Sequence, residues 1–271
     1  MEIYYGIPPM DSLSHIKERY DGVSVSENEA LSHSIIFLKE MGVPIFFGNL
    51  PAQTFRAKKE SRITKDGFTV NFSCAAAGAY EHTLPLGLWR SEGALVNGFP
   101  QARDYLYCIT NCVPIRLFDF YGEKSALCGK ISAKTAQNAQ IAALSVFKKR
   151  FEVLLPHTRR SSDITDLKNR LPCADVGAMI EDIGAECENI MESVKFVFVG
   201  SNDLLRAGHS EAEIIEFISK IAFYAKKHSK KLTVCGKITE NKEFLASCLG
   251  FGVENLCIDE DKYFEIVECF T

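Results

Sequence analysis

The stretches Val176-Gly-Ala-Met-Ile-Glu181, Phe196-Val-Phe-Val-Gly-Ser-Asn202-Asp203 and Leu232-Thr-Val-Cys235-Gly236 share one pattern. Each is an apolar run of strand length that ends in a polar or reactive residue, and each precedes a segment typical of a helix. This alternation predicts a βα barrel, in which the loops after the strands open on one common face. We therefore expect Glu181, Asn202, Asp203 and Cys235 to lie around one pocket.

The rest of the chain from residue 67 to residue 271 continues this alternation. Eight strand-like runs are found, and eight strands are the number that closes such a barrel. The runs are Phe68–Cys74, Leu86–Trp89, Val113–Phe118, Phe151–Leu155, Asp175–Ile180, Lys195–Gly200, Leu232–Cys235 and Asn255–Ile258. The clearest helix follows the sixth run, where Ser210 and Glu213 form a capping box. A second helix is expected from about Ala133 to Arg150.

The first 66 residues differ from the rest. They contain a helix-like stretch from Leu13 to Tyr20, a short strand-like run from Gly22 to Val25, and a polar, basic connector from Arg56 to Arg62. We take the connector as a linker. The predicted fold class is α/β, with a (βα)₈ TIM barrel over residues 67–271 preceded by a small α/β lobe over residues 1–66.

The composition narrows the class of protein. A formal net charge of −4 and a pI near 5.9 argue against nucleic acid as the main partner, because phosphate-backbone binding needs a basic face. The ten cysteines lack a zinc-site spacing, so reduced thiols of a cytoplasmic protein are expected. No stretch has the length and apolarity of a membrane span, and the N-terminus lacks the features of a signal peptide.

Five segments of the predicted barrel resemble, in order, motifs of the phosphoenolpyruvate-utilising enzymes, such as enzyme I of the sugar phosphotransferase system, phosphoenolpyruvate synthase and pyruvate phosphate dikinase. The similar segments are Gly87-Leu-Trp-Arg90-Ser-Glu92, Ile115-Arg116-Leu-Phe-Asp119-Phe-Tyr-Gly122-Glu-Lys124, Gly177-Ala-Met-Ile-Glu181, Val199-Gly-Ser-Asn202-Asp203-Leu and Val234-Cys235-Gly236. Each lies at or near the end of a predicted strand.

The resemblance implies a role for each of these polar residues. Glu181 and Asp203 would bind Mg²⁺, and Cys235 would protonate the enolate of pyruvate. The substrate, phosphoenolpyruvate, pyruvate or a related oxoacid, would be bound by Arg90, Arg116, Lys124 and Asn202. The chemistry is coherent, because a metal and several cations neutralise the charge of a transferring phosphoryl group. His157, directly after the fourth run, is a weaker candidate for the pocket.

A sixth segment lies in the lobe. Leu31-Ser-His33-Ser-Ile-Ile, followed by Gly42-Val-Pro-Ile-Phe-Phe-Gly48, is similar to the phosphohistidine motif of the same family. The resemblance implies that His33 is a catalytic residue that carries a phosphoryl group. It also implies a homodimer formed through the barrel as one form of assembly.

The chain departs from the family pattern at positions that carry chemistry. The interval from Ser125 to Ser132 contains no arginine, whereas the family has one there. Arg206 stands at a different position from a second active-site arginine of the family, and Lys237 replaces the glutamate that follows the cysteine and glycine. Three functions therefore stay open: a reduced phosphotransferase, a non-catalytic sensor or regulator of a phosphotransferase system, and an Mg²⁺-dependent oxoacid lyase or aldolase. Fold alone does not decide among them.

Overall fold

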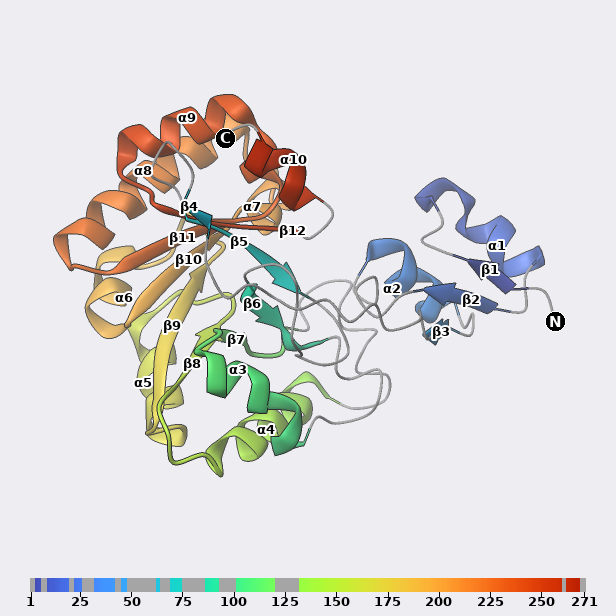
Figure 1. Cartoon of the computed structure of the whole chain (residues 1–271), viewed down its shortest axis with the longest axis horizontal. Coiled ribbons are helices and arrows are strands. Elements are labelled where there is room, and N and C mark those ends of the chain that lie inside the picture. The colour runs from blue at the N-terminus through green and yellow to red at the C-terminus, as the bar shows by residue number, and fades with distance from the viewer. Residues whose placement is uncertain are drawn as a thin grey trace.

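The computed structural model of the chain describes residues 3–5, 9–19, 22–25, 32–41, 45–47, 62–63, 69–74, 86–92, 101–119, 132–259 and 262–268. Within these residues, eight parallel strands from β5 to β12 pair in chain order, and β12 pairs in turn with β5 (Figure 1). The sheet thus closes on itself, and helices follow each strand from β6 to β12. This arrangement confirms the predicted TIM barrel.

The elements of the barrel follow one another along most of the chain. They are β4 (Arg62–Ile63), β5 (Thr69–Cys74), β6 (Leu86–Arg90), η4 (Ala102–Tyr105), α3 (Leu106–Asn111), β7 (Ile115–Arg116), α4 (Ala133–Ser145), β8 (Phe151–Leu155), α5 (Ser161–Arg170), β9 (Ala174–Ile180), α6 (Cys187–Ser193), β10 (Phe196–Gly200), α7 (Ser201–Arg206), α8 (Glu211–Lys227), β11 (Lys231–Cys235), η6 (Lys237–Glu240), α9 (Lys242–Phe251), β12 (Asn255–Asp259) and α10 (Tyr263–Glu268).

The lobe contains a second, smaller sheet. Its three parallel strands, β1 (Ile3–Tyr5), β2 (Gly22–Val25) and β3 (Ile45–Phe47), are joined by η1 (Met10–Ser12), α1 (Leu13–Arg19) and α2 (His33–Glu40). The α2 helix lies on the side of the lobe turned toward the barrel (Figure 1). The division at residues 66 and 67 stays a prediction, and β4, just before it, pairs with β5 of the barrel sheet.

Local sequence explains where the main helices begin and end. The predicted capping box forms, since Ser210 Oγ accepts from the Glu213 N–H and the Glu213 carboxylate accepts from the Ser210 N–H. The α4 helix begins as expected but ends at Ser145 rather than at Arg150. The chain there must turn back to reach β8, which begins at Phe151, so the basic residues before it lie outside the helix.

The β7 strand is shorter than the predicted run, and the reason lies in its hydrogen bonds. The Leu117 N–H still donates to the Leu154 carbonyl of β8. After Leu117 the backbone leaves the ladder: the Phe118 N–H donates to the Gln140 side chain and the Asp119 N–H donates to the Glu92 carboxylate. These bonds satisfy buried backbone donors without a neighbouring strand. They also fix Asp119 beside the end of β7.

The described residues of the barrel form two buried apolar layers. The larger one fills the space between strands and helices and includes Ile115, Val153 and Val176, which are aligned on neighbouring strands. A smaller buried cluster comprises Leu88, Leu154, Met179, Phe196, Phe198, Cys235 and Cys257. Because side chains alternate between the faces of a strand, we assign this second cluster to the barrel interior. None of the described helices is long and apolar enough to cross a lipid bilayer.

Candidate metal centre

The ends of β6 to β9 carry a buried group of charges centred on Arg116. Its guanidinium donates from Nη1 to Glu92 Oε1 at 2.9 Å, and from Nη2 to Asp119 Oδ2 at 2.8 Å and Glu181 Oε1 at 3.2 Å. Its Nε contacts Met179 Sδ at 3.1 Å. Burial by itself lowers the pKa of Arg116, but the surrounding carboxylates outweigh it and raise the pKa above its usual range. Arg116 is therefore charged and is the internal counterion of three acids.

Three potential metal ligands lie beside this network. One ligand atom from each of His157, Glu181 and Asp203 lies within 4.8 Å of the other two. His157 follows β8, Glu181 follows β9 and Asp203 lies in α7 after β10, so the closing of the sheet brings together three segments that are separate in the sequence. The structure thus has a candidate metal site, and two of its residues are the predicted ligands Glu181 and Asp203.

His157 is fixed by its backbone as well as by its ring. It has a positive φ of 48°, which is uncommon for a residue with a side chain, and its N–H donates to Glu181 Oε2 at 3.0 Å. Its ring nitrogens lie 3.3 Å from Asp119 Oδ1 and 3.5 Å from Glu181 Oε2. Burial lowers the pKa of His157, but the hydrogen bond to Asp119 and the charge of Glu181 outweigh it, and the pKa is raised.

The electrostatics of Glu181 suit a cation. The pKa of its carboxyl is raised to about 7, chiefly by burial and also by the neighbouring Asp203, although Arg116 and His157 act in the opposite direction. Two carboxyl groups so close together repel when both are ionised. Ligands on one Mg²⁺ lie at most about 4.2 Å apart, since each is about 2.1 Å from the ion. Small rotations of the side chains would therefore let the three residues bind one ion.

Two glycines allow the close packing around these ligands. A Cβ at Gly200 would lie 2.7 Å from Glu181 Oε1. Gly236 has a φ of +95°, and a Cβ there would lie 2.5 Å from Ser201 Oγ and 2.8 Å from Asn202 Oδ1. The β11 end can thus approach α7 closely, and the Lys237 N–H donates to Asn202 Oδ1 at 2.8 Å. Asn202 therefore ties α7 to the next strand end, and its role in substrate binding stays a prediction.

The predicted general acid lies next to this site but is deeply buried. Cys235 is 6% exposed, and its Sγ contacts the Val199 carbonyl at 3.2 Å. The pKa of the Cys235 thiol is raised to about 12, chiefly by burial and also by the charge of Glu181. The thiol is thus protonated at neutral pH, as a general acid must be. Whether it acts as one stays a prediction.

The remaining predicted residues lie at the rim or outside the described residues. Arg90 pairs with Asp259 at 3.3 Å, and Ser73 Oγ donates to the same carboxylate oxygen. His33 begins α2, is exposed, and lies within hydrogen-bond distance of Arg206. Lys124 falls outside the described residues. Substrate binding by Arg90, Arg116 and Lys124, and catalysis by His33, stay predictions.

The roles of His157, Glu92 and Asp119 were not predicted from the sequence. His157 was only a weak candidate, and the feature that indicated it was its position just after a strand. Glu92 and Asp119 lay inside recognised segments but were given no role. Each is an acid near the end of a strand that carries an arginine, and this pairing was the available signal. Their function as counterions becomes clear only when the partners of Arg116 are known.

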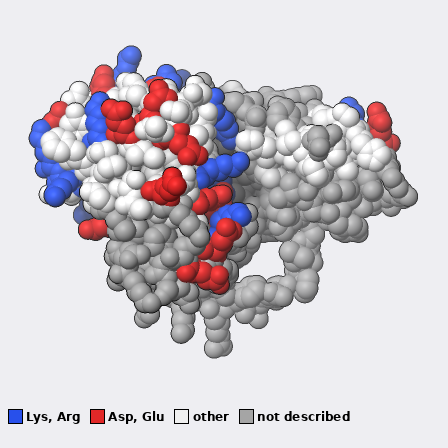
Figure 2. All heavy atoms as spheres, turned by 90° about the horizontal axis from the view of Figure 1, so that it is seen from above, with Lys and Arg blue, Asp and Glu red and all other residues white. Residues whose placement is uncertain are grey.

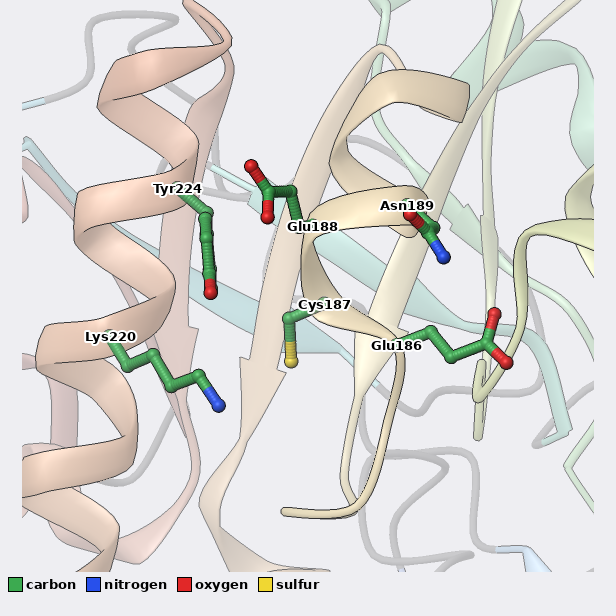
Figure 3. A pocket seen from close by; sticks show the side chains of 6 residues that line it. All are labelled: Glu186, Cys187, Glu188, Asn189, Lys220 and Tyr224. Atoms are coloured by element: carbon green, nitrogen blue, oxygen red, sulfur yellow. The ribbon is translucent and has the colours of Figure 1, made fainter.

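Among the residues that the structure describes, a hollow lies on the outside of the barrel. It lies between α6 and α8 and is lined by Glu186, Cys187, Glu188, Asn189, Lys220 and Tyr224 (Figure 3). Its charges are of both signs and it contains none of the candidate metal ligands. In Figure 2, Lys and Arg side chains are interspersed with Asp and Glu side chains over the described part of the visible face, in agreement with the small net charge.

Comparison with known proteins gives no match among family models and none among the curated proteins. Among solved structures, RipC from Yersinia pestis is 12% identical over 62% of this chain and 81% of its own, with a TM-score of 0.46. The citrate synthase SbnG is 11% identical over 99% and 90%, with a TM-score of 0.37. An HpcH/HpaI aldolase/citrate lyase family protein from Burkholderia cenocepacia is 9% identical over 99% and 92%, also with a TM-score of 0.37.

These findings correct the family expected from the sequence. The assignment to the phosphoenolpyruvate-utilising enzymes is wrong, since no family model supports it and the structural neighbours include members of the aldolase and citrate lyase family instead. The motifs that suggested it are short, and they describe strand ends that metal-binding barrels of other families can share. At these identities and TM-scores the neighbours do not assign an activity to this chain.

Proposed function

We propose that the protein is a divalent-metal-dependent lyase or aldolase that breaks or forms a carbon–carbon bond in a small oxoacid. The observation that carries the proposal is the group of His157, Glu181 and Asp203, which offers three ligand atoms within 4.8 Å of one another beside the buried Arg116. Carboxylates are the ligands that Mg²⁺ and Mn²⁺ prefer, and an imidazole nitrogen is a common ligand of transition metals.

The charge balance of the site favours oxoacid chemistry over phosphoryl transfer. Arg116 is fully engaged by Glu92, Asp119 and Glu181, so it adds no free cation for a trianionic phosphate. Phosphoryl transfer needs several cations around the moving group. An acidic site instead attracts one metal ion, and an oxoacid binds such an ion through its carboxylate and carbonyl oxygens.

Each residue of the site would have a separate role in the proposed reaction. A bound divalent ion would supply Lewis-acid polarisation of the substrate carbonyl. Arg116 holds Glu181 in place and neutralises part of the buried negative charge, and Asp119 orients the His157 ring. Cleavage of the carbon–carbon bond leaves an enolate, whose carbon must gain a proton. The protonated Cys235 thiol is the candidate donor, and the proton that the substrate hydroxyl loses on cleavage would restore it through water.

A direct assay tests the proposal. Purified protein is incubated with Mg²⁺ or Mn²⁺ and a set of 4-hydroxy-2-oxoacids, and pyruvate release is followed by a coupled reduction. We expect release that stops with EDTA and falls about 100-fold in Glu181→Gln. The matched control is Glu188→Gln, since Glu188 is an exposed acid paired with Lys227. The proposal would be overturned if the wild-type protein showed no pyruvate release and did not bind Mn²⁺.

A further inference from the structure

Arg206 connects the lobe to the candidate metal site. From the end of α7 its Nη1 donates to Asp203 Oδ1 at 2.7 Å, and its Nη2 lies within hydrogen-bond distance of His33 Nε2. His33 is the first residue of α2, the helix on the barrel-facing side of the lobe (Figure 1). A residue 170 positions earlier in the chain than Asp203 thus reaches that metal ligand through a single side chain.

The chemistry of the contact fixes the state of His33. An arginine has only N–H donors, so the histidine nitrogen that faces it must accept, which requires a neutral imidazole with its proton on Nδ1. The guanidinium is planar and rigid, and anchoring one nitrogen therefore orients the other. The Arg206 side chain is 43% exposed, and without the second anchor it would occupy several rotamers. His33 restricts it to the one that meets Asp203.

We infer that His33 is a positioning residue for the metal site, acting on Asp203 through Arg206. The inference rests on the proposed metal-dependent function and deepens it by giving the lobe a role. Arg206 donates to Oδ1 of Asp203, which is one of the three candidate ligands. His33 touches neither the ion nor the substrate. By thermodynamic linkage, metal binding must in turn stabilise the contact between α2 and α7.

The test is a calorimetric titration of Mn²⁺ into the full chain and its variants. His33→Ala removes the acceptor without changing the charge of the site, and we expect Mn²⁺ affinity to fall about 3- to 10-fold. His33→Gln keeps a neutral acceptor and should bind close to wild type. His15→Ala is the matched control, because His15 is an exposed histidine of α1 in the same lobe.

A double-mutant cycle separates positioning from a general structural effect. In an Arg206→Ala background, His33→Ala should leave Mn²⁺ affinity unchanged, because the side chain through which it acts is gone. Hydrogen exchange supplies a second readout. Addition of Mn²⁺ should slow exchange of the α2 amides in the wild-type protein and leave them unaffected in His33→Ala.

The outcomes distinguish this inference from the proposed function. Wild-type binding that Glu181→Gln abolishes, together with unchanged binding by His33→Ala, would overturn the positioning role and leave the metal site intact. A loss of affinity that persists in the Arg206→Ala background, or that His33→Gln does not rescue, would overturn the route through Arg206. Absence of Mn²⁺ binding by the wild-type protein would overturn the metal site and the positioning role with it.

Discussion

The two sides of the candidate metal site each hold a ligand with an arginine, but in opposite surroundings. On one side the Arg116 side chain is 3% exposed and the Glu181 side chain 2%. On the other side the Arg206 side chain is 43% exposed and the Asp203 side chain 17%. Coulombic interactions are much stronger in the interior than near water, and the desolvation of each ion is correspondingly more costly.

The difference indicates that the two sides do different work. The buried side cannot lose one charge without leaving others uncompensated, so it is part of what keeps the barrel folded. Loss of the Arg206–Asp203 ion pair on the exposed side should destabilise the fold little, so we expect this pair mainly to position the Asp203 carboxylate. Substitutions on the two sides should therefore separate stability from metal binding.

The largest effect is expected for Arg116→Met. The substitution leaves Glu92, Asp119 and Glu181 buried without their counterion, and we expect the free energy of unfolding to fall by about 3–5 kcal/mol. Urea unfolding followed by circular dichroism measures it. Arg150→Met is the control, because Arg150 pairs with Asp175 from a side chain that is 74% exposed. A similar loss in both variants would contradict the comparison.

The next effect is a dependence of stability on pH in the absence of metal. The pKa of Glu181 is about 7 in the folded protein against 4.5 for the ordinary carboxyl, so the folded state holds this proton more tightly. Its contribution to stability is complete below pH 4.5 and is lost as the pH rises through 7, by at most about 3 kcal/mol. Urea unfolding with EDTA at pH 5 and pH 8 tests this. The decrease in unfolding free energy from pH 5 to pH 8 should be smaller in Glu181→Gln than in the wild-type protein. Equal decreases in the two proteins would refute the prediction.

A smaller effect is expected for Gly200→Ala, which probes the packing behind the buried ligand. The new Cβ would lie 2.7 Å from Glu181 Oε1 and 2.8 Å from its Cγ, so the carboxylate must move. We expect about 1–3 kcal/mol of destabilisation, with weaker Mn²⁺ binding. Gly250→Ala is the control, since Gly250 lies in α9 with no atom within 4 Å of the added Cβ. It should stabilise the helix by about 0.5–1 kcal/mol, as judged from thermal unfolding.

The smallest effect on folding is expected for Arg206→Ala. An ion pair with one largely exposed partner contributes little, so the free energy of unfolding should change by less than about 1 kcal/mol. Urea unfolding of Arg206→Ala and Arg116→Met in one series compares the exposed and the buried arginine directly. If the two arginines proved equally important for folding, the exposed side would be structural as well.

The strands of the barrel could be located from the sequence because each is a short apolar run between polar segments. Phe151–Leu155 was predicted without error, and the other strands of the barrel, β7 excepted, agree at one end and differ by one residue at the other. The exception is β7, where the Gln140 and Glu92 side chains take over two backbone donors. Such bonds join residues more than 20 positions apart, and no local pattern signals them.

The sequence by itself determined that the chain alternates strands and helices and that Glu181 and Asp203 stand just past strand ends, because hydrophobic periodicity is local. Only the tertiary structure decided that Arg116 pairs with three acids, that the His157 ring lies within 4.8 Å of the Glu181 and Asp203 carboxylates, and that His33 contacts Arg206. These partnerships depend on which side chains the closed sheet and the lobe bring within a few ångströms of each other. Short motifs record the residues at a strand end, but burial and neighbouring charges decide what those residues can do.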